Sequence, residues 1–265
     1  MKASFVGEIA VVEYAPEERK RLKQFARELL QKHKNIKTVA VKATITEGKY
    51  RVRKIRVIAG KKTTETLYKE NNCVFKFDLN KVYFSPRLSF ERQRISEQVR
   101  PGEKVLVLFA GVGPYAIVIA KKLAWEKKID GTKIIGVEIN PAAVKYFEEN
   151  VLLNKVGGIV EVVRADAKKF LSKKQNLGKF DRIIMPLPKS GEKFLLGAVK
   201  CCGKNAVTHF YAIASEKQKN VFEETEKKVF AACKKVGRKC KILLERIALP
   251  YAPRVAQIVI DFRVK

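Results

Sequence analysis

Two glycines stand where a strongly apolar run ends and a helical pattern begins. The run occupies residues 105–108, and the residues of the turn that follows are Phe109, Ala110, Gly111, Val112 and Gly113. Glycines at a strand-to-helix turn let the main chain approach a ligand closely, and open α/β sheets bind their ligands at this edge. A glycine pair alone is weak evidence, because ordinary tight turns share it. With Ala116 at the third position, a dinucleotide site also stays open.

Acidic residues stand at the ends of the next two apolar runs. Glu138 ends the run 133–138, where its carboxylate can accept the hydroxyls of a ribose, and Ile139 beside it can cover an adenine face. Asp166 precedes Ala167 at the end of the third run, where its carboxylate can accept from an adenine amino group. For either acid alone, a helix N-cap or a surface carboxylate is an equally good interpretation.

The fourth apolar run ends in a stiff loop that contains Pro186 and Pro188. Acids at two successive strand ends, followed by a proline-containing loop after the fourth strand, form the layout of S-adenosylmethionine-dependent methyltransferases. We therefore expect S-adenosyl-L-methionine as cofactor, in contact with the glycine turn, the two acids and this loop. A nicotinamide dehydrogenase is disfavoured because the sequence offers no candidate histidine for handling a hydride, and no Walker lysine follows the glycines.

The apolar periodicity predicts the elements that position these residues. From about residue 96, short apolar runs alternate with helical patterns, which predicts a parallel sheet with helices on both faces. The last two runs, 240–248 and 254–264, should form an antiparallel edge. We expect an α/β, Rossmann-like class I methyltransferase domain over residues 93–265.

The region before it has a different pattern. Residues 17–34 have helical spacing, and alternating stretches at 38–46 and 50–60, joined by a hairpin-like turn at 47–49, predict antiparallel strands. Two more short strands are expected within residues 64–84. We therefore expect a smaller N-terminal α+β domain over residues 1–92, with many basic residues on its faces.

The charge balance points to a polyanionic partner. The chain has 56 Lys and Arg against 27 Asp and Glu, a formal net charge of +29. Such a field attracts nucleic acid and releases counterions on meeting phosphates. A lysine-rich solvated surface is the alternative. A membrane surface is disfavoured because no basic segment has a continuous apolar face.

Other features bound the class of protein. No run of about 18 apolar residues and no signal-peptide profile is present, so we expect a cytoplasmic protein without a membrane partner. The five cysteines have no CxxC spacing and the two histidines lie far apart. We expect reduced, mostly buried thiols and no metal site.

Several motifs resemble the archaeal and eukaryotic tRNA (guanine-37-N1) methyltransferase family. They are KVYFSPRLSFERQRI (81–95), FAGVGPY (109–115), EINPAAV (138–144), IMPLP (184–188) and YAPRVAQIVIDFRV (251–264), and together with GKYRVRKIRVIAG (48–60) and HFYAIA (209–214) they cover nearly the whole chain. The resemblance implies transfer of a methyl group from S-adenosylmethionine to N1 of the guanine 3′ of the anticodon. It implies tRNA as the partner and suggests a monomer.

The resemblance also implies catalytic roles. Glu91 matches the family's general base, which must reach the N1 proton directly or through a water. Arg51 matches the arginine that stabilises negative charge developing at O6, and Arg87 resembles a further active-site arginine that orients base or phosphate. Without the resemblance, the simpler interpretation of Glu91 is an ion-pair partner of Arg92 or Arg94 on a surface helix.

Three departures from the family pattern stand out. Pro186 occupies the place of an asparagine that helps to recognise the target guanine, which puts base recognition in doubt. Val107 replaces an acid common in the first strand. The chain begins about where the family's central domain begins, so the N-terminal module that touches the outer corner of tRNA is expected to be missing.

Three other functions stay open. A wybutosine-pathway enzyme shares this fold and cofactor but transfers an aminocarboxypropyl group, and it resembles an SxGN-like sequence where this chain has SPRL (85–88). A second relative methylates a tricyclic wyosine intermediate at carbon. A catalytically silent RNA-binding protein that kept the fold is the third alternative.

Overall fold

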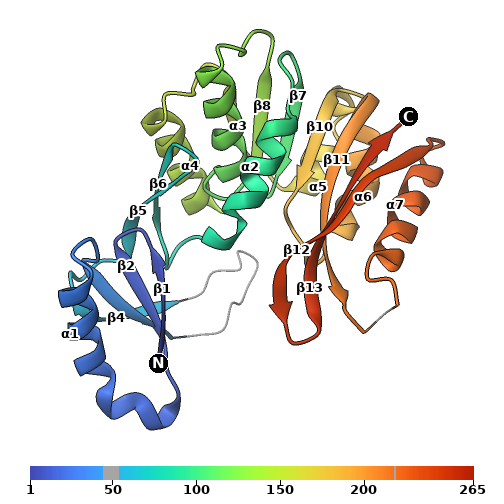
Figure 1. Ribbon diagram of the computed structural model, residues 1–265. Helices are drawn as coiled ribbons and strands as arrows, with labels where there is room; N and C mark the ends of the chain where they lie inside the picture. Colours follow the sequence, from blue (N-terminus) through green and yellow to red (C-terminus); the bar gives the residue numbers. More distant parts are fainter. Residues whose placement is uncertain (44–53, 218) are drawn as a thin grey trace.

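The computed structural model describes residues 1–43, 54–217 and 219–265. The predicted turn at residues 47–49 lies outside this part of the chain, as does Arg51. Figure 1 shows a small unit formed by the N-terminal strands beside a larger unit of sheet and helices.

The described part of the chain contains a seven-stranded sheet. Its strands are β7 (Lys104–Leu108), β8 (Lys133–Glu138), β9 (Val160–Arg164), β10 (Phe180–Met185), β11 (Cys202–Ser215), β12 (Cys240–Ala252) and β13 (Val255–Val264). Their order is β12-β13-β11-β10-β7-β8-β9. The pairs from β9 to β11 are parallel, whereas β13 pairs antiparallel with both β11 and β12. The predicted α/β sheet and its antiparallel edge are confirmed.

Helices cover both faces of this sheet. They are α2 (Ser89–Gln98), α3 (Pro114–Trp125), α4 (Pro141–Leu153), α5 (Ala167–Leu171), α6 (Glu192–Cys201) and α7 (Glu223–Lys235). Successive side chains of β7 point to opposite faces of the sheet and so contribute to both apolar cores. Val105 and Val107 join the core beneath α3 and α4, whereas Leu106 and Leu108 join the core beneath α5, α6 and α7. The apolar Val107 is therefore a fully buried packing residue.

The small unit has its own sheet, in the order β1-β2-β3-β4. The elements are β1 (Lys2–Val6), β2 (Ile9–Glu13), the 3₁₀ helix η1 (Pro16–Arg21), α1 (Leu22–Lys32), β3 (Thr38–Lys42) and β4 (Ile55–Gly60). The predicted helix is thus split into η1 and α1, and β1 and β2 were not predicted. The antiparallel pairing expected of the stretches at 38–46 and 50–60 is confirmed by β3 and β4. The pair β2–β3, which was not predicted, is parallel because α1 returns the chain to the same end.

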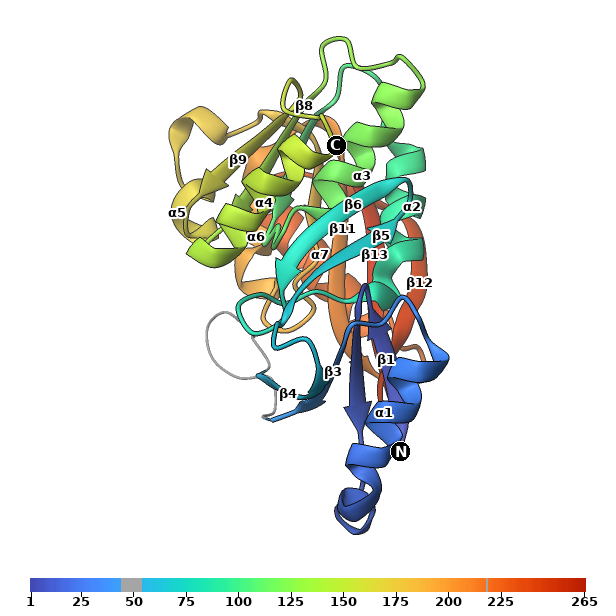
Figure 2. The ribbon, with the colours of Figure 1, turned by 90° about the vertical axis from the view of Figure 1, so that its left-hand side faces the viewer.

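A hairpin links the two units in sequence and packs on the larger one. It consists of β5 (Glu65–Glu70) and β6 (Cys73–Asp78), and Figure 2 shows it in front of α3 and α4. The Asn150 side chain of α4 accepts the main-chain N–H of Lys76 at 2.7 Å and donates to the carbonyl of Lys76 at 3.1 Å. The side chain of Asn154 makes the same pair of bonds with Val74, at 2.9 and 2.7 Å. The domain boundary after residue 92 stays a prediction.

Two further features of the structure are the character of its helices and the state of its thiols. None of the helices in the described residues has both the length and the apolar character needed to cross a membrane. The five cysteines all lie in the described part and are unpaired, and four of them are buried. Burial raises the pKa of Cys201 and of Cys233 to about 12, so these thiols stay protonated and unreactive at neutral pH.

Candidate active site

Three residues of the turn between β7 and α3 have left-handed backbone conformations. The φ values of Phe109, Gly111 and Gly113 are 53°, 57° and 87°. A Cβ on Gly111 would meet nothing nearer than the Tyr83 carbonyl oxygen at 3.9 Å, whereas a Cβ on Gly113 would lie 2.1 Å from the Phe147 ring. Gly111 therefore leaves open space for a ligand beside the main chain, and packing against α4 requires Gly113.

The Glu138 carboxylate joins the ends of β7 and β8. Its Oε2 accepts the main-chain N–H of Gly111 at 2.8 Å, and its Oε1 accepts those of Ile139 and Asn140 at 2.9 and 2.8 Å. A carboxylate has about four acceptor sites, so capacity remains for a ribose hydroxyl. Open space at Gly111 beside an acceptor fixed at the strand end fits the nucleoside part of S-adenosylmethionine.

Asp166 lies beyond the end of β9, the neighbour of β8. Its Oδ1 accepts the main-chain N–H groups of Lys168 and Lys169 at 2.8 and 3.3 Å, so Asp166 is the N-cap of α5 and buried Ala167 is the first helical residue. The helix-cap interpretation is therefore confirmed for Asp166. A contact between its carboxylate and an adenine amino group stays a prediction.

The proline-containing loop begins beside the glycine turn, because β10 is the neighbour of β7 in the sheet. Pro186 and Pro188 directly follow the end of β10, and both are half-buried. The ring of Phe109 packs edge-on against that of Phe194 on α6, with centroids 4.8 Å apart. The strand order reverses between β7 and β10, and ligands of open α/β sheets bind in the crevice at such a reversal.

Glu91 is buried in the first turn of α2, with a residue exposure of 2%. Its Oε2 accepts from the Tyr211 hydroxyl at 2.8 Å and from Nη2 of Arg94 at 3.0 Å. The partner on its own helix is thus Arg94, as one interpretation of the sequence suggested, but the pair is not on a surface. Arg92 instead pairs with buried Glu70 of β5.

Beneath Glu91, a chain of charged groups runs under α2 across three strands. Arg94 Nη1 donates to Asp261 Oδ2 at 2.6 Å, Asp261 Oδ1 lies 2.7 Å from His209 Nδ1, and His209 Nε2 lies 2.8 Å from Arg182 Nη1. Arg182 Nε in turn donates to Glu103 at 2.7 Å. This buried charge chain (Glu91, Arg94, Asp261, His209, Arg182 and Glu103) fixes α2 and therefore the position of the Glu91 carboxylate.

The protonation of the chain follows from its donors. Arginine can only donate, so Nε2 of His209 must accept, and the ring is a neutral imidazole that donates from Nδ1 to Asp261. Burial lowers the pKa of His209, in agreement with the neutral form. Burial alone would raise the pKa of Asp261, but His209 and Arg94 outweigh it and lower the pKa to about 2.

The 3₁₀ helix η2 (Pro86–Leu88) carries Arg87, which is exposed. Its Nη2 donates to the carbonyl of Pro250 near the tip of the β12–β13 hairpin, at 3.0 Å. Arg246 of the same hairpin lies 3.3 Å from Glu91 Oε1. The structure thus brings Arg87, Glu91 and the β12–β13 hairpin together at the N-terminal end of α2, while Arg51 lies outside the described residues.

Sequence reasoning did not assign Tyr211, Arg246 or the members of the buried charge chain other than Glu91 to the site. A signal was present for part of it, because Arg182, His209 and Asp261 each lie in a largely apolar strand. Burial of such groups requires partners, but their pairing depends on the order of β10, β11 and β13. That order places His209 opposite Asp261 in the ladder.

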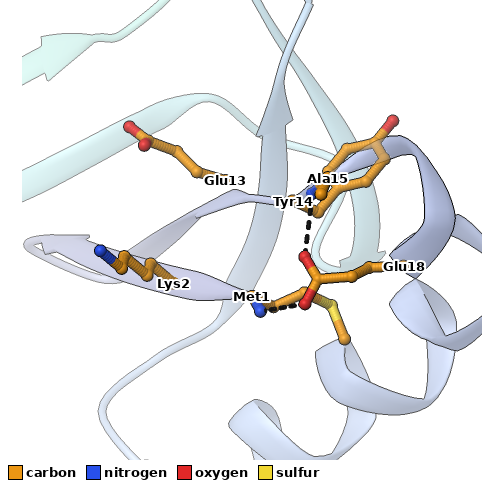
Figure 3. A pocket seen from close by; sticks show the side chains of 6 residues that line it. All are labelled: Met1, Lys2, Glu13, Tyr14, Ala15 and Glu18. Carbon is orange, nitrogen blue, oxygen red and sulfur yellow. Dashed lines mark hydrogen bonds and ion pairs between the residues drawn. The ribbon is translucent and has the colours of Figure 1, made fainter.

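An open surface pocket of about 380 Å³ lies elsewhere, on the small unit. Figure 3 shows its lining residues, which are Met1, Lys2, Glu13, Tyr14, Ala15 and Glu18. The Glu18 carboxylate closes one side, where it accepts the Ala15 main-chain N–H at 2.9 Å and pairs with the terminal amine of Met1. None of the predicted site residues that the structure describes lines this pocket.

Comparison with known proteins adds a family to this geometry. Residues 66–243 match the model of the TRM5/TYW2 methyltransferase domain, and residues 4–63 match that of the TYW2 N-terminal domain. The chain is 38% identical over 259 residues to the tRNA (guanine(37)-N(1))-methyltransferase Trm5b of Pyrococcus abyssi, an alignment that covers 98% of this chain and 73% of that protein.

Two further relatives agree. The tRNA (guanine(37)-N(1))/4-demethylwyosine(37)-methyltransferase Taw22 of Nanoarchaeum equitans is 35% identical, over 82% of this chain and 86% of its own. The crystal structure of Methanocaldococcus jannaschii Trm5 in complex with adenosine superposes with a TM-score of 0.80 at 30% identity, covering 99% of this chain and 72% of that one. The extent of these matches confirms the predicted resemblance, and the chain belongs to the TRM5/TYW2 methyltransferase family.

Proposed function

We propose that this protein is an S-adenosyl-L-methionine-dependent tRNA methyltransferase that forms N1-methylguanine at position 37. The observation that carries the proposal is the setting of Glu91, a carboxylate buried in the first turn of α2 and held by Arg94 and Tyr211. Relatives named for this activity align over nearly the whole chain.

Deprotonation of guanine N1 is the step that the protein must assist. Neutral guanine carries a proton on N1, so a base must take it as the new N–C bond forms, and negative charge develops on O6. Glu91 takes this proton on its carboxylate, while Arg94 and Tyr211 keep the carboxylate in one orientation. A positioned general base of this kind contributes about 10²–10⁴-fold to the rate.

Residues at the strand ends hold the cofactor, which supplies an electrophilic methyl group when bound. The turn made by Phe109, Ala110, Gly111 and Gly113 receives it along the main chain. Glu138 would accept from its ribose hydroxyls, and Ile139, Asp166 and Ala167 would hold the adenine. Pro186 and Pro188 border the crevice from β10, on the side where the reacting group must lie.

Two arginines complete the proposed machinery. Arg87, exposed beside Glu91 on η2, orients the acceptor through a phosphate or the base itself. Arg51 stabilises the negative charge at O6, a role that rests on the sequence match. tRNA is the acceptor, the chain acts as a monomer in the cytoplasm, and the charge of +29 attracts the RNA.

The proposal is tested with purified protein, S-adenosylmethionine and an unmodified transcript with guanine at position 37. After digestion, mass spectrometry should show one added methyl group on guanosine. Glu91→Gln should slow single-turnover methyl transfer by about 10²–10⁴-fold. A Glu97→Gln variant, on the same helix, is the matched control and should keep the native rate. An unchanged rate for Glu91→Gln would remove Glu91 from the role of base.

A second activity is favoured by one observation. Pro186 offers no side-chain amide where the family has an asparagine that recognises guanine, and the related Taw22 is named for both guanine 37 and 4-demethylwyosine. Methylation of the tricyclic base is therefore the second candidate. Methyl transfer restricted to a tricyclic base would establish this second activity. An added aminocarboxypropyl group would instead identify the protein as the wybutosine-pathway enzyme. Cofactor binding without turnover on any tRNA would indicate a silent RNA-binding protein.

A further inference from the structure

The two oxygens of the Glu91 carboxylate have different surroundings. Oε2 accepts from the Tyr211 hydroxyl at 2.8 Å and from Arg94 Nη2 and Nε at 3.0 and 3.1 Å. Oε1 lies 3.3 Å from Arg94 Nε and 3.3 Å from Nη1 of Arg246. Oε2 is thus bound tightly by buried groups, and Oε1 is the oxygen better placed to accept a proton.

Arg94 and Arg246 differ in how firmly they are held. Arg94 is 11% exposed at its side chain and is fixed from behind by Asp261, at 2.6 Å. Arg246 is 33% exposed at its side chain, and its guanidinium carbon lies 5.1 Å from the ring centre of Phe90, which is itself 62% exposed. Arg246 therefore covers Oε1 from the solvent side, where its side chain can move away.

Arg246 and the N1 proton of guanine compete for the same oxygen of Glu91. A base must present a free oxygen to this proton, but in the free protein Arg246 covers Oε1. The guanine must arrive from the solvent side, because the opposite side of the carboxylate is filled by Arg94 and Tyr211. The acceptor also brings phosphates, which are alternative anions for a displaced guanidinium.

We infer that Arg246 is a displaceable positioning residue, which pairs with Glu91 Oε1 in the free protein and exchanges this partner for a backbone phosphate of the acceptor RNA. The inference rests on the proposed function, in which Glu91 is the base. Arg246 then keeps the base ordered before the RNA arrives, and RNA binding itself exposes Oε1. The exchange couples deprotonation to a correctly seated acceptor.

The exchange predicts an unusual binding result for the base variant. Loss of the Glu91 charge frees Arg246, so Glu91→Gln should bind a guanine-37 transcript more tightly than the native protein does. A partly exposed ion pair is weak, so the gain should be about 1.5- to fivefold. The measurement is a fluorescence-anisotropy titration without cofactor, in which no turnover occurs.

Variants of Arg246 form the second part of the binding experiment. Arg246→Ala should weaken binding and lower the slope of log affinity against log salt by about 0.7–0.9, the value for one phosphate contact. Arg246→Lys should keep most of the slope. In the Arg246→Ala background, Glu91→Gln should bring no gain. Arg263→Ala is the matched control, because it removes one exposed arginine at the opposite end of the β12–β13 pair.

Three results would overturn the exchange. They are an unchanged or weaker affinity of Glu91→Gln, a gain that persists without Arg246, and a full salt slope for Arg246→Ala. If Glu91→Gln does not fold, the slope of Arg246→Ala against Arg263→Ala decides alone. Failure of the proposed function is read separately, since nucleoside mass spectrometry of the native protein would then show no methylated guanosine.

Discussion

At the scale of single residues, the site depends on charges that neutralise one another beneath α2. Among the described residues, the buried charge chain and Arg246 contribute three carboxylates and three guanidiniums around a neutral His209. A buried charge is tolerated when it is paired and hydrogen-bonded. The Glu91 carboxylate therefore occupies an interior position with charged partners at both of its oxygens.

His209 makes the stability of the protein depend on pH. Its folded-state pKa is lowered, so its contribution is present above the unfolded value of about 6.5 and is lost as pH falls towards the folded value. Protonation would place a hydrogen on Nε2, facing the donor Arg182. The pKa of Asp261 is lowered to about 2, so the stability that its ionised form contributes is lost only in stronger acid, below the unfolded pKa of about 3.9.

We predict that the free energy of unfolding declines between pH 7 and pH 5, by at most about 1.4 kcal/mol per pH unit for one proton. His209→Gln should abolish this decline, because its amide can accept from Arg182 and donate to Asp261 without titrating. Urea unfolding across the pH range measures it. His33 is the second of the two histidines, and His33→Gln should leave the decline intact. A pH profile that His209→Gln does not change would contradict the assignment.

At the scale of elements, two glycines of the turn between β7 and α3, Gly111 and Gly113, are needed for different reasons. Gly111 has a positive φ and open space, whereas Gly113 has a positive φ and the Phe147 ring where a Cβ would be. Gly111 has a backbone conformation that favours glycine and leaves room for the proposed ligand, whereas Gly113 is required by the packing of α3 on α4. Sequence spacing alone assigned both to ligand binding.

Substitution separates the two glycines. Gly111→Ala should destabilise the protein by about 1 kcal/mol through its backbone conformation, and it should weaken cofactor binding more than tenfold by filling the approach. Gly113→Ala should destabilise the protein by several kcal/mol in total, since strain and overpacking add. Thermal unfolding and calorimetry with S-adenosylhomocysteine measure both effects. Gly158→Ala, with no neighbour in reach and an ordinary φ, should change neither. Equal stability losses at Gly111 and Gly113 would contradict this distinction.

Much of the element pattern was predictable because it is local. Apolar runs gave the strands of the large sheet, and the ends of β7 and β8 fell where Gly111 and Glu138 were expected. The docking of the β5–β6 hairpin was not predictable, because Asn150 and Asn154 bind main-chain groups 74 and 80 residues away. The surroundings of Glu91 escaped prediction for the same reason, since they need the order of distant strands.

At the scale of the whole molecule, the two faces of the sheet serve different purposes. The face under α2, α3 and α4 carries the buried charge chain beside an apolar core, whereas an apolar core packs against α5, α6 and α7 on the opposite face. The reversal of strand order between β7 and β10 places the proposed S-adenosylmethionine crevice at one edge of the sheet. The hairpin of β12 and β13 reaches that edge from the far end of the sheet and adds Arg246.

The excess of basic residues creates a positive field around the whole molecule. This field should strengthen the binding of tRNA, which is a polyanion, but not that of S-adenosylmethionine. We predict that tRNA affinity falls about 10³–10⁵-fold between 50 and 200 mM salt if about 6–10 phosphates are contacted. Affinity for S-adenosylmethionine should change less than about threefold, because its proposed site offers hydrogen bonds to Glu138 and main-chain contacts, which release few counterions. Parallel titrations of both ligands across the salt range measure this difference. A shallow dependence for tRNA would mean that most lysines only solvate the surface, and the acceptor would then be held by the few arginines around Glu91.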